Sequence, residues 1–419
     1  MPMTPPLPAS LSEKKLRTLA GTVVELLEES RRMLMDTGLP ADLYLRKTFR
    51  LRRCLGSRDR RFITEAVFAF YRWAVWISKA FPESVSTEKQ LLAAWAAEGI
   101  RPPVWDLWCK DPTLADRVFR PDSPEERFEV FTGVPVSSRD MLPEWMLPLL
   151  APGAEKEYLP YLKKRPPVWI RIQHDPEKVF REFEKNDVGY IADDRLPGAY
   201  RLSGHTGINL LLLESFRSGC FEFQDFSSQC IGAACMAKPG SLWWDVCAGS
   251  GGKTLYLASA GARVVAGDIR ESSLEELRRR AARGRFSGIR VLSRETAERR
   301  MFDGILTDAP CSSSGRWRRN PEARLTLTRE RLDELCRIQR DILDSVCSRV
   351  KPGGLLVYGT CSVFNCENLG TAEYFLRTHS DFEPCPFPFD GKEQWFRQSF
   401  PSDADCDGGF RAVFRRKER

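Results

Sequence analysis

Two cysteines of this chain stand in short polar segments that follow apolar runs. The two segments read Asp308-Ala309-Pro310-Cys311-Ser312 and Thr360-Cys361-Ser362. The runs in front of them, at 305–306 and 355–358, predict buried parallel strands. Ligands of open α/β sheets bind beyond the carboxyl ends of the strands, so both thiols are expected at one reaction centre. A thiolate in such a place is a candidate covalent nucleophile.

A glycine-rich turn follows a third apolar run, at 242–244. It reads Asp245-Val246-Cys247-Ala248-Gly249-Ser250-Gly251-Gly252-Lys253-Thr254. A phosphate-binding P-loop is excluded, because Cys247 stands where its first glycine is required. A dinucleotide fingerprint is excluded as well, because Thr254 stands at its third glycine. Glycines still allow a ligand to approach the backbone closely, so the turn predicts a cofactor site of another kind.

From about residue 226 the pattern alternates strand and helix, which predicts a mostly parallel, doubly wound α/β sheet. Asp268 ends the second predicted strand, where a carboxylate can accept both hydroxyl hydrogens of a ribose. The alternative is that Asp268 caps the helix predicted over 272–280. Glu295 is the acidic residue nearest the end of the third predicted strand.

These motifs resemble those of the Sun-type RNA (cytosine-5) methyltransferases, in the branch that acts on bacterial 16S ribosomal RNA. The family turn reads Asp-x-Cys-Ala-Ala-Pro-Gly-Gly-Lys-Thr, and this chain departs from it only at Gly249 and Ser250. Losing the proline should leave the turn more flexible before binding. Four further segments match the family: 224–229, 314–322, Glu367-Asn368 and 408–412.

The resemblance implies a Rossmann-like methyltransferase domain that uses S-adenosylmethionine. It implies that Cys361 attacks carbon 6 of the cytosine, that Cys311 assists release of the product, and that Asp308 helps to hold cofactor and base. The cofactor residues it implies are Cys247, Ala248, Gly249, Ser250, Gly251, Gly252, Lys253, Asp268, Glu295 and Asp308. For any single cysteine the alternative is a small buried hydrophobe.

The segment before residue 150 contains apolar residues at helical spacing and predicts an all-α domain. Its run from Arg46 to Arg61 carries eight basic residues against one acid. The part Arg58-Asp59-Arg60-Arg61-Phe62-Ile63 resembles the NusB-like RNA-binding domain of the family; the alternative is a solvated basic face. We therefore predict a NusB-like domain at 1–150, a linker with a small α+β subdomain at 151–225, and the catalytic domain at 226–419.

Composition sets the remaining expectations. A chain of 419 residues is too long for one core. No apolar run approaches the ~18 residues of a membrane span, and the start at Met1 shows no signal peptide. The 13 scattered cysteines predict reduced thiols, and with only His174, His205 and His379 a zinc site has little support. We expect a cytoplasmic monomer without metal, and the net charge of +7 permits an RNA partner.

The sequence thus predicts an S-adenosylmethionine-dependent RNA cytosine-5 methyltransferase that acts on small-subunit ribosomal RNA. One alternative is the same chemistry on transfer RNA. A second alternative is a non-catalytic RNA-binding or ribosome-assembly factor, which the altered Gly249-Ser250 motivates and the retention of both cysteines opposes.

Overall fold

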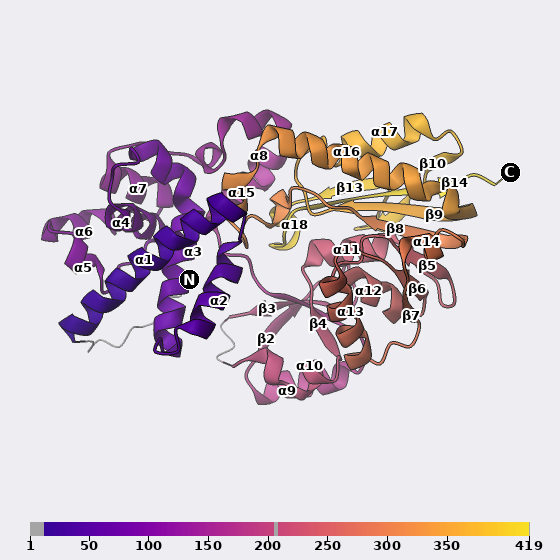
Figure 1. Ribbon diagram of the computed structural model, residues 1–419, viewed down its shortest axis with the longest axis horizontal. Helices are drawn as coiled ribbons and strands as arrows, with labels where there is room; N and C mark the ends of the chain where they lie inside the picture. The colour runs from indigo at the N-terminus through magenta and orange to yellow at the C-terminus, as the bar shows by residue number, and fades with distance from the viewer. Residues whose placement is uncertain (1–11, 205–207, 419) are drawn as a thin grey trace. The chain divides into compact units, whose positions relative to one another are not determined.

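The structure is a computed structural model that describes residues 12–204 and 208–418; Met1 and His205 lie outside this part. The chain forms two compact units (Figure 1). Unit 1 comprises the described residues of Met1–Pro148, Leu159–Arg165 and Trp317–Leu327. Unit 2 comprises those of Leu149–Tyr158, Pro166–Arg316 and Thr328–Arg419. The predicted three-domain division at 150 and 225 stays a prediction.

Unit 1 is all-helical in its described residues, as the sequence predicted. Its helices are α1 (Glu13–Thr37), α2 (Ala41–Leu51), α3 (Ser57–Ala80), α4 (Thr87–Glu98), α5 (Trp105–Trp108), α6 (Pro112–Val118), α7 (Pro124–Thr132) and α15 (Ala323–Thr326), with 3-10 turns at Ser138–Met141, Glu144–Leu149 and Leu159–Lys163. Helix α3 buries Phe62, Ile63, Ala66, Val67 and Phe70, an apolar stripe at helical spacing.

The segment Trp317–Leu327 belongs to unit 1, although the residues on either side of it belong to unit 2. Arg324 is 1% exposed and donates to the carbonyl oxygens of Tyr71, at 3.1 Å, and of Arg72 in α3. Glu322 is also 1% exposed, and its Oε1 accepts the N–H of Ala41 at 3.2 Å. The late segment is therefore part of the buried polar structure of the helical unit.

A small antiparallel sheet opens unit 2. The described strands pair in the order β2-β3-β1-β4, with bounds β1 (Trp169–Ile172), β2 (Gly189–Ala192), β3 (Ala199–Ser203) and β4 (Phe221–Phe223). Helix α8 (Ala154–Glu157) precedes this sheet in the chain, and the helical pieces around the sheet are α9 (Pro176–Lys185), a 3-10 turn at Leu210–Leu212 and α10 (Glu214–Arg217). This agrees with the predicted α+β subdomain in kind.

The larger sheet of unit 2 is mixed. Its strands are β5 (Leu242–Asp245), β6 (Arg263–Ala266), β7 (Ile289–Val291), β8 (Phe302–Asp308), β9 (Val350–Thr360), β10 (Phe382–Pro384), β13 (Phe396–Ser399) and β14 (Gly409–Arg416). The described strands run in the order β10-β14-β9-β8-β5-β6-β7, and β13 pairs with β14. Strands β5 to β9 are mutually parallel, whereas β14 is antiparallel to β9. The predicted doubly wound sheet is confirmed.

Helices cover both faces of this sheet (Figure 1). One face packs with α11 (Phe226–Ala234) and α12 (Gly252–Ser259), and the other with α16 (Arg329–Val346) and α17 (Leu369–Thr378). Strand β8 alternates accordingly: Leu306 faces the first core and Ile305 the second. The remaining elements are α13 (Glu271–Arg283), α14 (Arg294–Ala297), 3-10 turns at Ser314–Arg316 and Cys347–Arg349, α18 (Pro401–Ala404), and the hairpin β11 (Phe387–Phe389) and β12 (Lys392–Gln394).

No helix in the described part of the chain combines the length and the apolar character that a membrane crossing requires.

Candidate active site

The parallel strands of unit 2 end in register at one edge of the sheet. Asp245 of β5 pairs with Leu306 of β8, and Asp308 of β8 pairs with Gly359 of β9. The segments that follow these strands therefore emerge side by side. This is the placement that the sequence predicted for the glycine turn and the two cysteines.

The two cysteines lie in contact with each other. The Sγ atoms of Cys311, just after β8, and Cys361, directly after β9, are 3.4 Å apart. The hydroxyl of Ser313 lies 3.5 Å from Cys361 Sγ, and the N–H of Gly315 donates to the carbonyl of Cys361 at 2.9 Å. Both side chains are partly exposed, so a substrate atom can reach them.

The two thiols differ in acidity. A hydrogen bond from the Cys311 thiol stabilises the Cys361 thiolate and lowers the pKa of Cys361, with help from the positive charge of Arg316 and the Ser313 hydroxyl. The same hydrogen bond raises the pKa of Cys311 well above its ordinary value, because Cys311 must keep its proton to donate it. The pair therefore favours a thiolate at Cys361 and a thiol at Cys311.

Glu367 connects the two cysteine segments. Its side chain is fully buried, and its Oε1 accepts the N–H of Ser312 at 2.8 Å and Nε2 of Gln339 at 2.9 Å. Its Oε2 accepts the hydroxyls of Ser312 and Ser362, each at 2.5 Å. Burial raises the pKa of Glu367, and the four hydrogen bonds oppose that rise. One carboxylate thus joins the residue after Cys311 to the residue after Cys361.

A second buried contact joins the glycine turn to the thiol side. Nζ of Lys253, in the first turn of α12, lies 2.7 Å from Oδ2 of Asp308. Burial would lower the pKa of Lys253, but the negative charge of Asp308 outweighs it and the pKa lies above its ordinary value. Lys253 therefore stays charged beside the thiolate of Cys361, and the ion pair fixes Asp308 at the end of β8.

The glycine turn connects β5 to α12 in a conformation that only glycine adopts easily. Gly249 has φ of +53° and Gly251 has φ of +89°. A Cβ atom built on Gly251 would lie 2.2 Å from Leu277 Cδ1, so α13 closes one side of the turn. A Cβ atom built on Gly249 would meet only Arg270, at 3.8 Å, among the described atoms, so a ligand can approach the backbone there.

Asp268 lies two residues beyond β6 and faces the turn. Its Oδ2 accepts the N–H of Gly249 at 2.8 Å, and its Oδ1 accepts the N–H of Arg270 at 2.9 Å. Burial alone would raise its pKa, but the hydrogen bonds from Arg270 and Gly249 outweigh burial and lower it. The residue at the start of α13 is Arg270, without a side-chain cap, so the helix-cap alternative for Asp268 is wrong.

Asp245 supports the turn from beneath. It is 1% exposed, and its Oδ2 accepts the hydroxyl of Thr254 at 2.7 Å. Burial raises the pKa of Asp245 to about 7. Burial also raises the pKa of the Cys247 thiol, which fits a packed cysteine rather than a nucleophile.

The structure brings all of the predicted site residues except Glu295 to one edge of the sheet. Those that the structure brings to one edge of the sheet are Cys247, Ala248, Gly249, Ser250, Gly251, Gly252, Lys253, Asp268, Asp308, Cys311 and Cys361. Glu295 lies in the first turn of α14 with an exposed side chain, and its role stays a prediction. Among the described residues, no group of three His, Cys, Asp or Glu side chains could hold a metal ion.

Sequence reasoning gave no role to Glu367, Gln339 or Arg270. Glu367 belongs to a segment that matches the family, and its position six residues after Cys361 was the only indication in the sequence that it could lie near the thiols. Arg270 follows Asp268 by two residues, a spacing at which a carboxylate commonly accepts the backbone N–H. Gln339, in the middle of α16, carries no signal in the sequence.

Comparison with known proteins places this geometry in a family. Residues 234–415 match the model of the family described as 16S rRNA methyltransferase RsmB/F. The chain is 30% identical over 293 residues to ribosomal RNA small subunit methyltransferase B of Proteus mirabilis, covering 67% of this chain and 67% of that protein.

Two solved structures share the fold. The crystal structure of PH0851 has a TM-score of 0.72 at 22% identity and covers 98% of this chain and 99% of that one. NSun6 from Pyrococcus horikoshii, solved with SFG, has a TM-score of 0.53 at 17% identity and covers 61% of this chain and 92% of that one. With the family match and the relative at 30% identity, the chain belongs to the RsmB/F family of 16S rRNA methyltransferases.

Proposed function

We propose that this enzyme methylates carbon 5 of a cytosine in small-subunit ribosomal RNA, through a covalent bond between Cys361 and carbon 6. The observation that carries the proposal is the thiol pair. Its Sγ atoms are 3.4 Å apart, and the pair lies at the sheet edge that also carries the glycine turn. The hydrogen bond from Cys311 lowers the pKa of Cys361 and raises that of Cys311, which favours Cys361 as the nucleophile.

The residues at the glycine turn fit S-adenosylmethionine. The open backbone at Gly249 can receive the cofactor. Asp268 accepts the N–H groups of Gly249 and Arg270 and also the guanidinium of Arg270, whose side chain is 66% exposed. Ribose hydroxyls can replace this exposed guanidinium at the carboxylate. When bound, S-adenosylmethionine supplies an electrophilic methyl group on a sulfonium. The structure of NSun6, which shares the fold, was solved with SFG, an S-adenosylmethionine analogue.

The thiolate of Cys361 activates the cytosine ring for methylation. Carbon 5 is a poor nucleophile until a bond from Sγ to carbon 6 makes the ring electron-rich. Carbon 5 then forms the bond to the methyl group while the bond from that methyl group to the sulfonium sulfur breaks, which leaves a neutral thioether. The proton of carbon 5 afterwards passes to a base at the site. Breaking the bond to carbon 6 returns the electron pair to Sγ and restores the aromatic ring. We assign Cys311, held against Cys361, to assist this release.

RNA as substrate is supported by the family and by the names of the relatives. The relative in Proteus mirabilis is named for the small ribosomal subunit. A target cytosine must leave its stack to reach two thiols at the end of a sheet, so an unstacked loop is the expected target structure.

The test is transfer of labelled methyl groups from S-adenosylmethionine to purified 16S ribosomal RNA, small subunits and transfer RNA, followed by bisulfite sequencing. We expect 5-methylcytosine in the 16S RNA, and none with the Cys361→Ala variant. Methylation of transfer RNA alone would establish the first alternative. If calorimetry detects no binding of S-adenosylmethionine while the chain still binds RNA, the alternative of a non-catalytic RNA-binding factor is established.

A further inference from the structure

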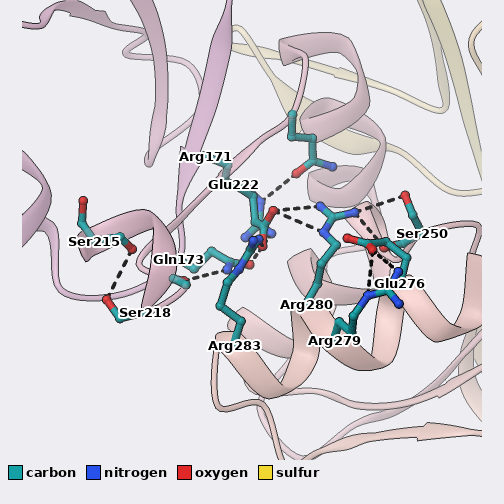
Figure 2. Close-up of polar contacts among 12 residues, drawn as sticks. Arg171, Gln173, Ser215, Ser218, Glu222, Ser250, Glu276, Arg279, Arg280 and Arg283 are labelled. Atoms are coloured by element: carbon teal, nitrogen blue, oxygen red, sulfur yellow. Dashed lines mark hydrogen bonds and ion pairs between the residues drawn. The ribbon is translucent and has the colours of Figure 1, made fainter. Parts of the chain in front are cut away.

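The serine in the glycine turn is held from outside the turn. Nη1 of Arg280, on α13, donates to the carbonyl oxygen of Ser250 at 2.7 Å and to its hydroxyl at 3.2 Å (Figure 2). Within the turn, Gly249 binds Asp268 and Gly251 donates to Ala248. Ser250 itself is exposed, so Arg280 is the contact that restrains it.

Arg280 is held in turn by a buried carboxylate. Glu222, on β4, is 3% exposed, and its Oε2 accepts Nη2 of Arg280 at 3.0 Å and Nε at 3.2 Å (Figure 2). Its Oε1 pairs with Arg283, one turn further along α13. A carboxylate without water around it orients a planar guanidinium strongly, and only one edge of Arg280 remains for Ser250.

The neighbouring arginines show that this is a specific arrangement. Arg279 is 67% exposed in its side chain and pairs with Glu276 on its own helix (Figure 2). The Arg280 side chain is 11% exposed. The three consecutive arginines of α13 therefore have different roles, and only Arg280 contacts the turn among the three.

We propose that Arg280 is a positioning residue for cofactor binding, an inference that rests on the proposed function. Arg280 is anchored on Glu222 and restrains the glycine turn at Ser250. The restraint acts where the family has proline, whose ring would limit the backbone at this position without an outside contact. The turn of this chain is then preorganised by an ion pair instead of by a ring.

The test is calorimetric binding of S-adenosylmethionine to the full chain and to Arg280→Lys. A lysine ammonium cannot span Glu222 and Ser250 as a guanidinium does, so the Kd should rise about tenfold. The matched control is Arg279→Lys, which should stay within about twofold of wild type. At saturating cofactor the kcat of Arg280→Lys should be nearly unchanged, because the thiol pair is untouched.

The rescue variant is Ser250→Pro, which puts the restraint into the backbone; Gly249 tolerates the constraint that a following proline imposes. In the Ser250→Pro background, Arg280→Lys should change the Kd by less than about twofold. Wild-type affinity in Arg280→Lys, or an equal loss in both backgrounds, would overturn the inference. If Arg280→Lys does not fold, Glu222→Gln replaces it, because it removes the charge that anchors Arg280: a Kd raised about threefold supports the inference and an unchanged Kd overturns it. A wild-type chain that binds no cofactor would instead refute the proposed function.

Discussion

Replacing Glu367 by glutamine should separate two steps of the reaction. The glutamine keeps one oxygen, so two of the four donors on Glu367 lose their acceptor and the other two keep an uncharged one. The hydroxyls of Ser312 and Ser362, 3.3 Å apart, can pair with each other and recover part of the loss. We therefore expect the free energy of unfolding to fall by about 2 kcal/mol, within the range for hydrogen bonds to charged groups.

The catalytic effect should fall on product release. Ser312 is bound to Glu367 through both its N–H and its hydroxyl, so the neighbouring Cys311 should shift relative to Cys361. Displacements of this kind cost up to ~100-fold in rate, so we expect kcat to fall at least tenfold while the KM for S-adenosylmethionine is unchanged.

The assay is single-turnover methylation with denaturing gels that detect the RNA–protein adduct. The adduct should persist in Glu367→Gln, and the control is Glu373→Gln, a change of an exposed glutamate on α17. Wild-type kcat together with normal adduct turnover in Glu367→Gln would refute the reasoning.

Four further predictions follow from the described contacts. Cys311→Ala should accumulate an RNA adduct that requires S-adenosylmethionine and is absent in Cys311→Ala/Cys361→Ala; an adduct in Cys361→Ala instead would reverse the two roles. Asp268→Ala should weaken cofactor binding by roughly tenfold or more in calorimetry, with RNA affinity unchanged. Because burial raises the pKa of Asp245 to about 7, the folded state keeps a proton that the unfolded state releases. The free energy of unfolding should therefore fall as pH rises from about 4 to 7, and Asp245→Asn should abolish this fall in denaturation at several pH values. Charge reversal of the exposed basic run should lower the slope of log K for RNA against log salt by up to ~0.9 per phosphate contact, whereas an identical slope would mean a solvated face. The residues to reverse are Arg53, Arg58 and Arg61.

The choice of those three arginines corrects what the sequence alone would select. Arg52 pairs with Glu25 at 2.5 Å, and this hydrogen bond raises the pKa of Arg52. Arg60 donates to the carbonyl of Leu55 at 2.9 Å and lies over the ring of Phe49. Reversing either residue would disturb contacts within the helical unit as well as any contact with RNA.

The sheet and the placement of its functional residues could be predicted because both depend on local pattern. Apolar runs of strand length ended by Asp245, Asp308 and Thr360 are visible in one dimension, and the direction of parallel strands then brings their ends together. The assignment of a role to each of the two thiols came from the family resemblance. The geometry adds the hydrogen bond that favours Cys361 as the thiolate.

Contacts between distant segments could not be predicted. Arg278, Arg279 and Arg280 are alike in the sequence, and only the packing of α13 against the turn and β4 selects Arg280. Gln339 of α16 donates to Glu367 and to the carbonyl of Pro310, and these contacts between segments far apart in the chain leave no local pattern in the sequence.

The detour of the chain through Trp317–Leu327 has a consequence for biosynthesis. A ribosome releases the helices of unit 1 first, but the segment that supplies Arg324 and Glu322 to them emerges only after β5 to β8 have been made. Until then, the carbonyl of Tyr71 and the N–H of Ala41 lack the partners they have in the finished protein. A fragment that ends at residue 150 would therefore lack the buried contacts that Arg324 and Glu322 make in the complete helical unit.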